Sequence, residues 1–216
     1  MKHRLGYMIM PLVAMLYIEE ASAVPNQYYI GTDFIYDFNK VNGGPTFKMS
    51  NPQVTQEIDY PKSMPTAAIN VGYNFSERLG IEASYQMSGR KDHKMYNVYS
   101  MNSQLKSETR YQSYGLDFIA YIRSTDKVDW LLSAGVGQYE FETKFKYTNG
   151  GTPVRKYTDK EDSLAPRVGA GIQINLDEYV SFRAMFRYVF IDVPGIDKMQ
   201  EIMLGVRLGF SPFFYN

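Results

Sequence analysis

The chain has 216 residues, and its 23 Lys and Arg balance its 23 Asp and Glu, so the formal net charge at pH 7 is zero. This balance gives no electrostatic case for nucleic acid as a partner, and the absence of cysteine excludes a disulfide framework, thiol chemistry and cysteine metal sites. Aromatic residues make up 15% of the chain, with 19 Tyr among them, and the length fits one domain.

Residues 1–23 have the pattern of a secretory signal peptide. A basic start at residues 2–4 precedes an apolar stretch over residues 5–18, and residues 21–23 form an A-x-A cleavage site. The apolar stretch of about 14 residues is too short to span a bilayer, which needs roughly 20. We therefore expect export, cleavage, and one mature domain over residues 24–216.

Eight later segments alternate apolar and polar residues with a period of two, which predicts β-strands. In chain order they are residues 28–37, 66–75, 79–88, 109–123, 128–143, 164–176, 179–190 and 201–210. In the last segment Ile202, Leu204 and Val206 fall on one face, while Glu201 and Arg207 fall on the other. The apolar face is broad, aromatic and free of charge, which is typical of strands that face lipid.

The fifth segment changes parity near Gly137. Before it Trp130 and Val136 belong to the apolar face, but beyond it Tyr139 and Phe141 take the apolar role on the opposite face. Either a β-bulge at Gly137 or a strand that has left the membrane would produce this change.

The connections between segments alternate in length. Residues 76–78, 124–127 and 177–178 form tight turns, and the long links are residues 38–65, 89–108, 144–163 and, shorter, 192–199. The pattern predicts an all-β fold: an eight-stranded antiparallel transmembrane β-barrel with short periplasmic turns and long extracellular loops. The links are polar, and we expect them to project into solvent without a core of their own.

Four stretches carry a resemblance to a known family. They are residues 29–34, 71–85, 166–172 and 205–210. In these stretches the chain resembles the small eight-stranded outer-membrane barrels, of the OmpA/OmpX type and the opacity type. The resemblance implies residence in the cell outer membrane among lipid and lipopolysaccharide. It also implies recognition of the C-terminal strand by the barrel assembly machinery.

Charged residues gather on the faces predicted to point inward. They are Asp33, Glu82, Asp117, Arg123, Arg167, Arg183, Arg187, Glu201 and Arg207. An eight-stranded interior is just wide enough for side chains to fill it, and buried charges must be paired. We expect a plug of salt bridges. A narrow ion path, a proton-sensing gate, and a catalytic pair of Glu82 with Glu201 are the alternatives.

The sequence predicts no catalytic, cofactor or metal site. Enzymatic barrels of this size use a His together with a Ser, yet the histidines here are only His3, in the leader, and His93, in a charged link. The G-x-G matches at 135–137 and 169–171 lie in strands rather than before a helix. We interpret them as small inward residues that make room for arginines.

The second and third long links combine cations with tyrosines, a combination that can contact proteins or anionic glycans. The candidate contact residues are Arg90, Lys91, Lys94, Tyr96, Tyr99, Lys144, Lys146, Tyr147, Arg155, Lys156 and Tyr157. The alternative is that these cations bridge lipopolysaccharide phosphates or are simply solvated.

These observations favour a non-enzymatic surface protein, an adhesin or surface antigen that also supports the envelope and acts through its loops. A host protein or glycan would be its partner, and nucleic acid would not. A narrow ion-conducting, porin-like pore and a lipid-modifying outer-membrane enzyme are the alternatives from other classes.

Overall fold

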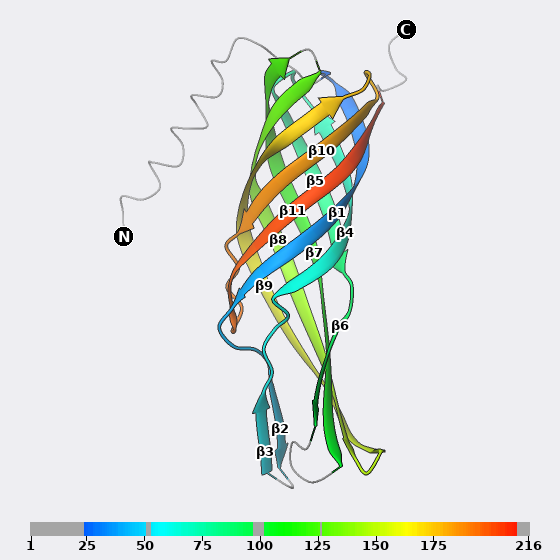
Figure 1. Cartoon of the computed structure of the whole chain (residues 1–216). Coiled ribbons are helices and arrows are strands. Elements are labelled where there is room, and N and C mark those ends of the chain that lie inside the picture. The colour runs from blue at the N-terminus through cyan, green and yellow to red at the C-terminus, as the bar shows by residue number, and fades with distance from the viewer. Residues whose placement is uncertain (1–23, 51–52, 97–101, 126, 211–216) are drawn as a thin grey trace, which may run out of the picture.

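The computed structural model describes residues 24–50, 53–96, 102–125 and 127–210 (Figure 1). Eight strands form a closed antiparallel barrel in the order β5-β4-β1-β11-β10-β9-β8-β7, and pairing of β5 with β7 completes the ring. They are β1 (Gln27–Val41), β4 (Ser63–Asn74), β5 (Leu79–Ser88), β7 (Ser103–Thr125), β8 (Val128–Asn149), β9 (Thr152–Asn175), β10 (Val180–Val189) and β11 (Ile196–Phe210). Each of the eight predicted segments lies in one of these strands, apart from residues 75, 176, 179 and 190 at the segment ends. The predicted signal peptide lies outside the described residues.

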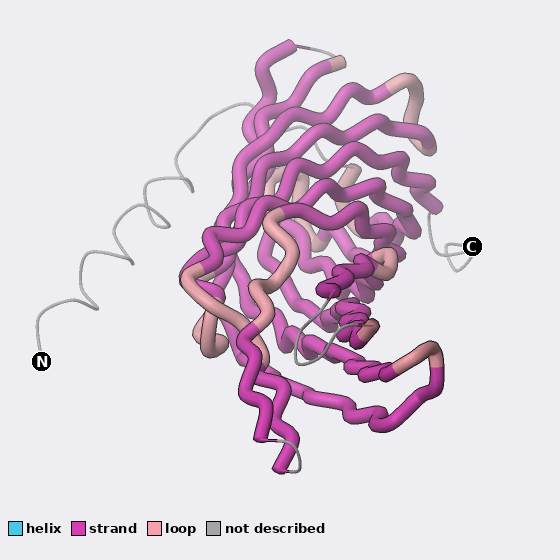
Figure 2. The backbone as a smooth tube through the Cα atoms, turned by 60° about the horizontal axis from the view of Figure 1, so that its bottom comes forward, coloured by secondary structure: helices cyan, strands magenta, loops and turns pink. Residues whose placement is uncertain are grey.

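Three further strands lie outside the barrel wall, where loops were predicted. β2 (Thr46–Ser50) and β3 (Gln53–Glu57) form a separate hairpin, and β6 (Lys91–Tyr96) pairs with the far end of β7. The strands β7, β8 and β9 have 23, 22 and 24 residues and run well past the wall, as Figures 1 and 2 show. We call β2, β3, β6 and residues 103–112 and 140–162 the extension.

The extension corrects the prediction that residues 144–163 form an open loop. β8 and β9 continue to a two-residue turn at Gly150 and Gly151, whose φ angles are 56° and 81°. Two positive φ values suit the turn type that matches the twist of a hairpin, and glycine adopts them without strain. The link is therefore a β-hairpin, with one register shift between Tyr147 and Thr148.

The parity change near Gly137 is not a β-bulge. The register of β8 with both neighbours is unbroken from Trp130 to Tyr147. The inward positions hold Tyr139 and Phe141, which are buried, while Glu140 on the outward side is exposed. The strand keeps its geometry and the surroundings of its outer face change from lipid to water, which reverses the polarity that each face needs.

The outer surface of the barrel wall is apolar. Phe34, Ile69, Phe118 and Leu204 expose 55–58% of their surface although they are large and hydrophobic. Aromatic pairs lie near both ends of this surface: Tyr28 packs on Tyr73 and Phe210 near the short turns, and Tyr188 packs on Phe190 near the extension. Such a belt with aromatic ends is expected of strands in contact with lipid. No helix in the described part of the chain is long and apolar enough to cross a membrane.

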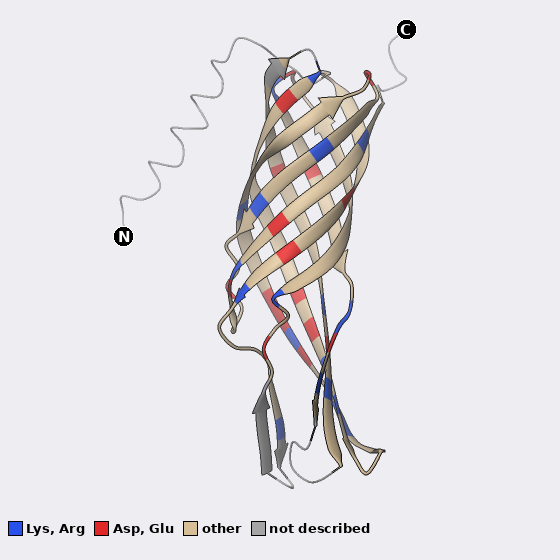
Figure 3. Ribbon diagram, in the orientation of Figure 1, with Lys and Arg blue, Asp and Glu red and all other residues tan. Residues whose placement is uncertain are grey.

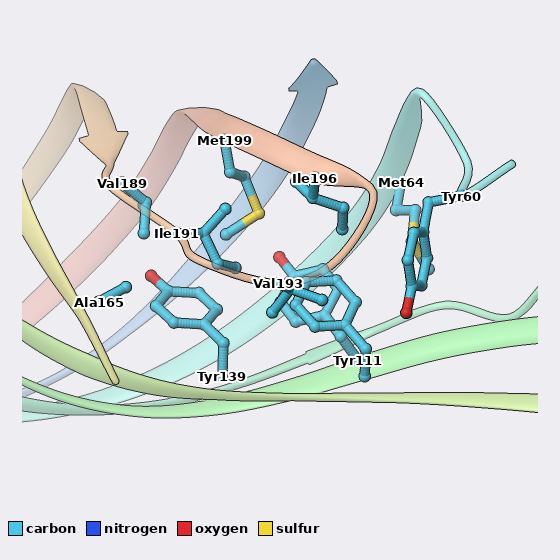
Figure 4. Close-up of a cluster of buried hydrophobic side chains, with 11 residues drawn as sticks. Tyr60, Met64, Tyr111, Tyr139, Ala165, Val189, Ile191, Val193, Ile196 and Met199 are labelled. Carbon is cyan, nitrogen blue, oxygen red and sulfur yellow. The ribbon is translucent and has the colours of Figure 1, made fainter. Parts of the chain in front are cut away.

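The described residues form three buried apolar clusters, two inside the barrel and one in the extension. Seven residues form the cluster inside the wall: Ile35, Ala68, Ile119, Tyr121, Leu131, Met185 and Met203. A larger cluster fills the barrel mouth toward the extension, where Tyr111 and Tyr139 rise toward Ile191 and Val193 of the loop between β10 and β11 (Figure 4). The third holds Phe47, Ile58, Leu105, Phe145 and Tyr147. The third cluster shows that the prediction of coreless links was wrong.

Candidate functional site

The interior charges form two buried groups inside the barrel, which together make up the network. The Arg183 guanidinium donates to Glu82 at 2.9 and 3.0 Å and to Asp33 at 2.9 Å. Arg207 contacts the same two acids, with Nη2 at 3.0 Å from Asp33 Oδ2 and Nε at 3.3 Å from Glu82 Oε2. The contact between Arg207 and Asp33 forms because β1 and β11 are neighbours in the closed ring, where Asp33 is opposite Gly205, two residues from Arg207.

A second group of charges lies nearer the extension. Arg167 donates to Asp117 at 2.8 Å and to Ser84 at 2.9 Å. Arg187 donates to Glu201 and, at 2.8 Å, to Gln86, and it lies 3.5 Å from Asp117. Because Asp117 contacts both Arg167 and Arg187, these two pairs form one connected group.

Glycines leave room for the arginines, as predicted. Most of the glycines that do so, however, are not those of the G-x-G matches at 135–137 and 169–171. A Cβ at Gly115 would overlap the guanidinium of Arg167, and a Cβ at Gly31 would overlap that of Arg207. Of the four glycines in the G-x-G matches, only Gly137 has an arginine among its nearest neighbours.

Eight of the nine residues predicted for the network are buried and form ion pairs. The ninth is Arg123, whose side chain is not among those that the structure describes. The predicted charge network leaves out two inward carboxylates. Asp37 accepts hydrogen bonds from Thr66 at 2.5 Å and from Tyr111, and Asp129 accepts one from Asn175 at 2.7 Å. Both keep the parity of predicted inward residues, and this signal was available in the sequence.

The network lies between a polar cavity and an apolar cluster. At the end with the short turns, a cavity of about 340 Å³ reaches Arg183 and Arg207 and is lined also by Tyr29 and Tyr121. At the other end the apolar cluster of Figure 4 fills the mouth. A polar cavity, the charge network and an apolar cluster thus follow one another along the barrel. This order suits a plugged interior that water can reach only from the end with the short turns.

The outer face of the extension carries a row of four lysines. In the antiparallel register Lys94 is opposite Lys106, Lys106 is opposite Lys146, and Lys146 is opposite Lys156. Opposed residues in such pairs project on the same face. Lys94, Lys146 and Lys156 are exposed, and none of the three has an ion pair with another described residue. Figure 3 shows cationic positions along this part of the ribbon.

Other predicted contact cations are neutralised by acids of the same face. Arg90 lies 3.3 Å from Glu108, and Lys144 lies 2.9 Å from Glu142. The hydrogen bond from Lys144 lowers the pKa of Glu142. Lys106 lies 2.8 Å from Asp92, and this contact raises the pKa of Lys106. Three of the four lysines in the row, Lys94, Lys146 and Lys156, therefore have no acid of the described residues that neutralises their charge.

The remaining predicted contact residues fall in different places. Tyr147 is 2% exposed and packs on Phe47, so its prediction as a surface contact was wrong. Lys91, Arg155 and Tyr157 are exposed. Tyr99 and the side chain of Tyr96 lie outside the described part of the chain.

A groove of about 390 Å³ lies between β2 and β9. Tyr60 and Tyr157 line it together with Lys48, Asp159 and Glu161. Asp159 raises the pKa of Tyr157, while burial, followed by Glu161 and Asp159, raises that of Tyr60. The groove thus has aromatic walls with a carboxylate pair on one side.

The described residues contain no assembled metal site. No set of three or more His, Asp or Glu residues there is arranged to hold a metal ion. His93 lies exposed on β6, opposite Ser107, on a strand outside the barrel wall.

Comparisons with known proteins agree with the fold. Residues 8–210 match the family described as "Outer membrane protein beta-barrel domain", and no curated protein matches the sequence. OprG from Pseudomonas aeruginosa is 12% identical, covers 88% of this chain and 99% of its own, and has a TM-score of 0.58. Ail, the attachment invasion locus protein of Yersinia pestis, solved with the heparin analogue sucrose octasulfate, is 16% identical, covers 87% and 100%, and has a TM-score of 0.54.

Proposed function

The chain belongs to the outer-membrane β-barrel family and resides in the cell outer membrane, and we propose that it is a non-enzymatic surface protein that binds anionic glycans. The observation that carries the proposal is the lysine row across β6, β7, β8 and β9. The extension, rather than the barrel interior, would hold the site.

The lysine row works against the stability of the sheet that carries it. Like charges directly opposite each other on neighbouring strands are destabilising. Only Lys106 has a close acid among the described residues, at 2.8 Å from Asp92. An arrangement that costs stability at four consecutive strands is best explained by an external ligand that removes the repulsion.

The dimensions of the lysine row suit an extended polyanion. Neighbouring strands are about 4.8 Å apart, so four strands place the ammonium groups along roughly 14 Å. The row lies eight residues beyond Gln138, the first polar outward residue of β8, which is roughly 27 Å along the strand. A ligand at that distance would come from outside the cell more readily than from the protein's own lipid layer. Ail, which shares the fold, was solved with a sulfated sugar.

The test compares two double variants that remove the same charge from the same two strands. Lys146→Gln with Lys156→Gln removes half of the lysine row, while Lys144→Gln with Lys160→Gln removes lysines that lie 2.9 and 4.0 Å from Glu142. We expect the first pair to weaken binding of the purified barrel to heparin about tenfold or more and to reduce its salt dependence. The second pair should change binding far less.

The same variants test the energetic argument. Removing opposed lysines should leave the thermal midpoint of unfolding unchanged or higher, because the repulsion is gone. Equal loss of heparin binding in both double variants would contradict the assignment to the row. Unchanged heparin binding with weakened binding to the protein's own lipopolysaccharide would support the alternative of lipid-phosphate bridging.

A narrow pore is the second candidate. The cavity of about 340 Å³ at the short turns favours it, because water can enter the barrel there. The apolar cluster at the other mouth opposes ion passage. Single-channel recordings in planar bilayers would decide: steady conductance of the wild-type barrel would favour the pore. The signal peptide and recognition of the last strand by the assembly machinery stay predictions.

A further inference from the structure

One edge of the sheet in the extension is open. β10 ends at Val189, which pairs with Arg167 of β9. Beyond that point, the residues of β9 toward its start pair only with β8 among the described strands. Barrels normally remove strand edges by closing, and an unpaired edge is a template for another strand.

The direction of the free backbone groups follows from one hydrogen bond. The Phe190 amide donates to the Pro166 carbonyl at 2.9 Å, so that carbonyl faces away from β8. Backbone groups alternate sides along a strand, and the register of β9 with β8 is unbroken from Pro166 to Arg155. The N–H and C=O groups of Lys156, Thr158, Lys160 and Asp162 therefore face the open side.

The groove between β2 and β9 lies on the inner side of this edge. Tyr157, Asp159 and Glu161 project into it, and Tyr60 and Lys48 lie across from them. A strand that pairs with β9 would place every second side chain in the groove. Those side chains would meet two carboxylates, then an aromatic ring, then Arg155.

We propose that the open edge of β9 binds an extended peptide segment of another protein by strand addition, with basic residues opposite Asp159 and Glu161. Main-chain hydrogen bonds supply the affinity of this recognition mode, and alternate side chains supply the specificity. The peptide runs antiparallel to β9, so its basic residues come first, then an aromatic residue, then an acid opposite Arg155. This site goes beyond the glycan proposal, because it uses the edge and inner side of the extension rather than the outer lysine row.

Like charges oppose the pairing of a second copy with this edge in the registers centred on residues 158, 159 and 160. Antiparallel self-pairing centred on residue 158 would set Lys156 opposite Lys160. Centring on residue 159 or 160 would set Asp159 opposite itself or opposite Glu161. Like charges at opposed positions are unfavourable, and lysines on an edge strand discourage self-association.

The experiment uses the full-length mature barrel in nanodiscs and a fluorescent peptide, Thr-Lys-Thr-Lys-Thr-Tyr-Thr-Glu-Thr. A matched peptide carries N-methyl groups on its second and third threonines, which keeps the side chains but removes two donors to β9. The protein variants are Lys160→Pro, which deletes an edge N–H, and Lys160→Ala, which keeps it. Proline is tolerated at edge positions whose N–H faces solvent. Thr158→Pro with Thr158→Ala is a second such pair, in case one proline prevents folding.

We expect binding by fluorescence anisotropy that weakens about tenfold with the N-methylated peptide and with either proline variant. The alanine variants should bind the peptide like the wild type, and heparin binding should change little in all four. The peptide should slow hydrogen exchange at the amides of residues 156, 158, 160 and 162. Equal binding of the N-methylated peptide, or proline variants that bind like their alanine controls, would overturn the proposal. Protection of these amides that rises with protein concentration without peptide would assign the edge to a second copy instead.

Discussion

Arg183 on β10 contacts acids from two other strands of the barrel, β1 and β5. Its guanidinium pairs with Glu82 through two hydrogen bonds and with Asp33 through a third. All three side chains are at most 4% exposed. Removal of one buried partner leaves an uncompensated charge, whereas removal of both partners does not.

Arg183→Met should therefore destabilise the barrel by about 3 to 5 kcal/mol, and Arg183→Met with Glu82→Gln should cost clearly less than the sum of the single changes. Arg207, 3.3 Å from Glu82, will offset part of the loss. Urea unfolding of the barrel in lipid vesicles measures all four members of the cycle. Strictly additive losses would indicate a wet interior with independent charges and would favour the pore.

Inward residues could be predicted one by one from strand parity, and their contacts could not. Asp33 and Glu82 lie on the polar faces of their segments, so burial followed from the period of two. Which arginine meets which acid depends on shear and strand order around the closed ring. The contacts of Met203 could not be predicted either. Met203 is an apolar residue on the otherwise polar inward face of the last strand, and in the structure it packs on Met185 and Ile35 in the apolar cluster inside the wall.

Along β10, one outward aromatic residue lies in the middle of the lipid layer and another lies near the interface with water. Phe186 lies at its middle with 46% of its surface exposed, and Phe190 lies just past its end with 49% exposed. The exposed fractions of the two side chains are thus nearly equal, and the main difference between the positions is their depth in the lipid. The cost of a charge on the lipid-facing side falls steeply from the midplane to the interface.

We expect Phe186→Arg to destabilise by about 2 to 4 kcal/mol and Phe190→Arg by about 0 to 1 kcal/mol. Phe190 also packs on Tyr188 with ring centroids 4.8 Å apart, so Phe190→Ala serves as the control for lost ring contact. Chemical unfolding in bilayers of fixed thickness gives the three values. Equal penalties for both arginines would contradict the depth assignment of this strand.

At the level of elements, the wall strands were predictable and the extension was not. In β8 the alternation continues through Phe145 and Tyr147, but its polarity is reversed relative to Trp130. A segment whose polarity is reversed in this way looks like a polar loop in the sequence, unless the residues that cover its apolar face are known. That cover is Phe47 from a separate link, in ring contact with Phe145 at 5.7 Å, and a pairing so distant in sequence has no local signal.

The whole molecule consists of a lipid-embedded wall with a second, water-exposed sheet built on three of its strands. The apolar cluster of the extension joins β2 to β7 and β8. Because this cluster is separate from the cluster in the barrel mouth, the two parts should be separable by truncation. The hairpin of β2 and β3 must be shortened together with β8 and β9, since otherwise Phe47 loses its cover.

The last prediction uses this separation. A barrel in which residues 46–57, 90–106 and 144–160 are replaced by tight turns should still insert and remain heat-modifiable on gels, because Tyr111, Tyr139 and the rest of the mouth cluster are kept. It should lose heparin binding, because Lys94, Lys106, Lys146 and Lys156 are all removed. A control that shortens only residues 144–160 should bind 8-anilinonaphthalene-1-sulfonate more strongly, because it uncovers Phe47 and Leu105. If the trimmed barrel retained heparin with wild-type affinity, the glycan site would have to lie on the wall or its rim, and the extension would have another role.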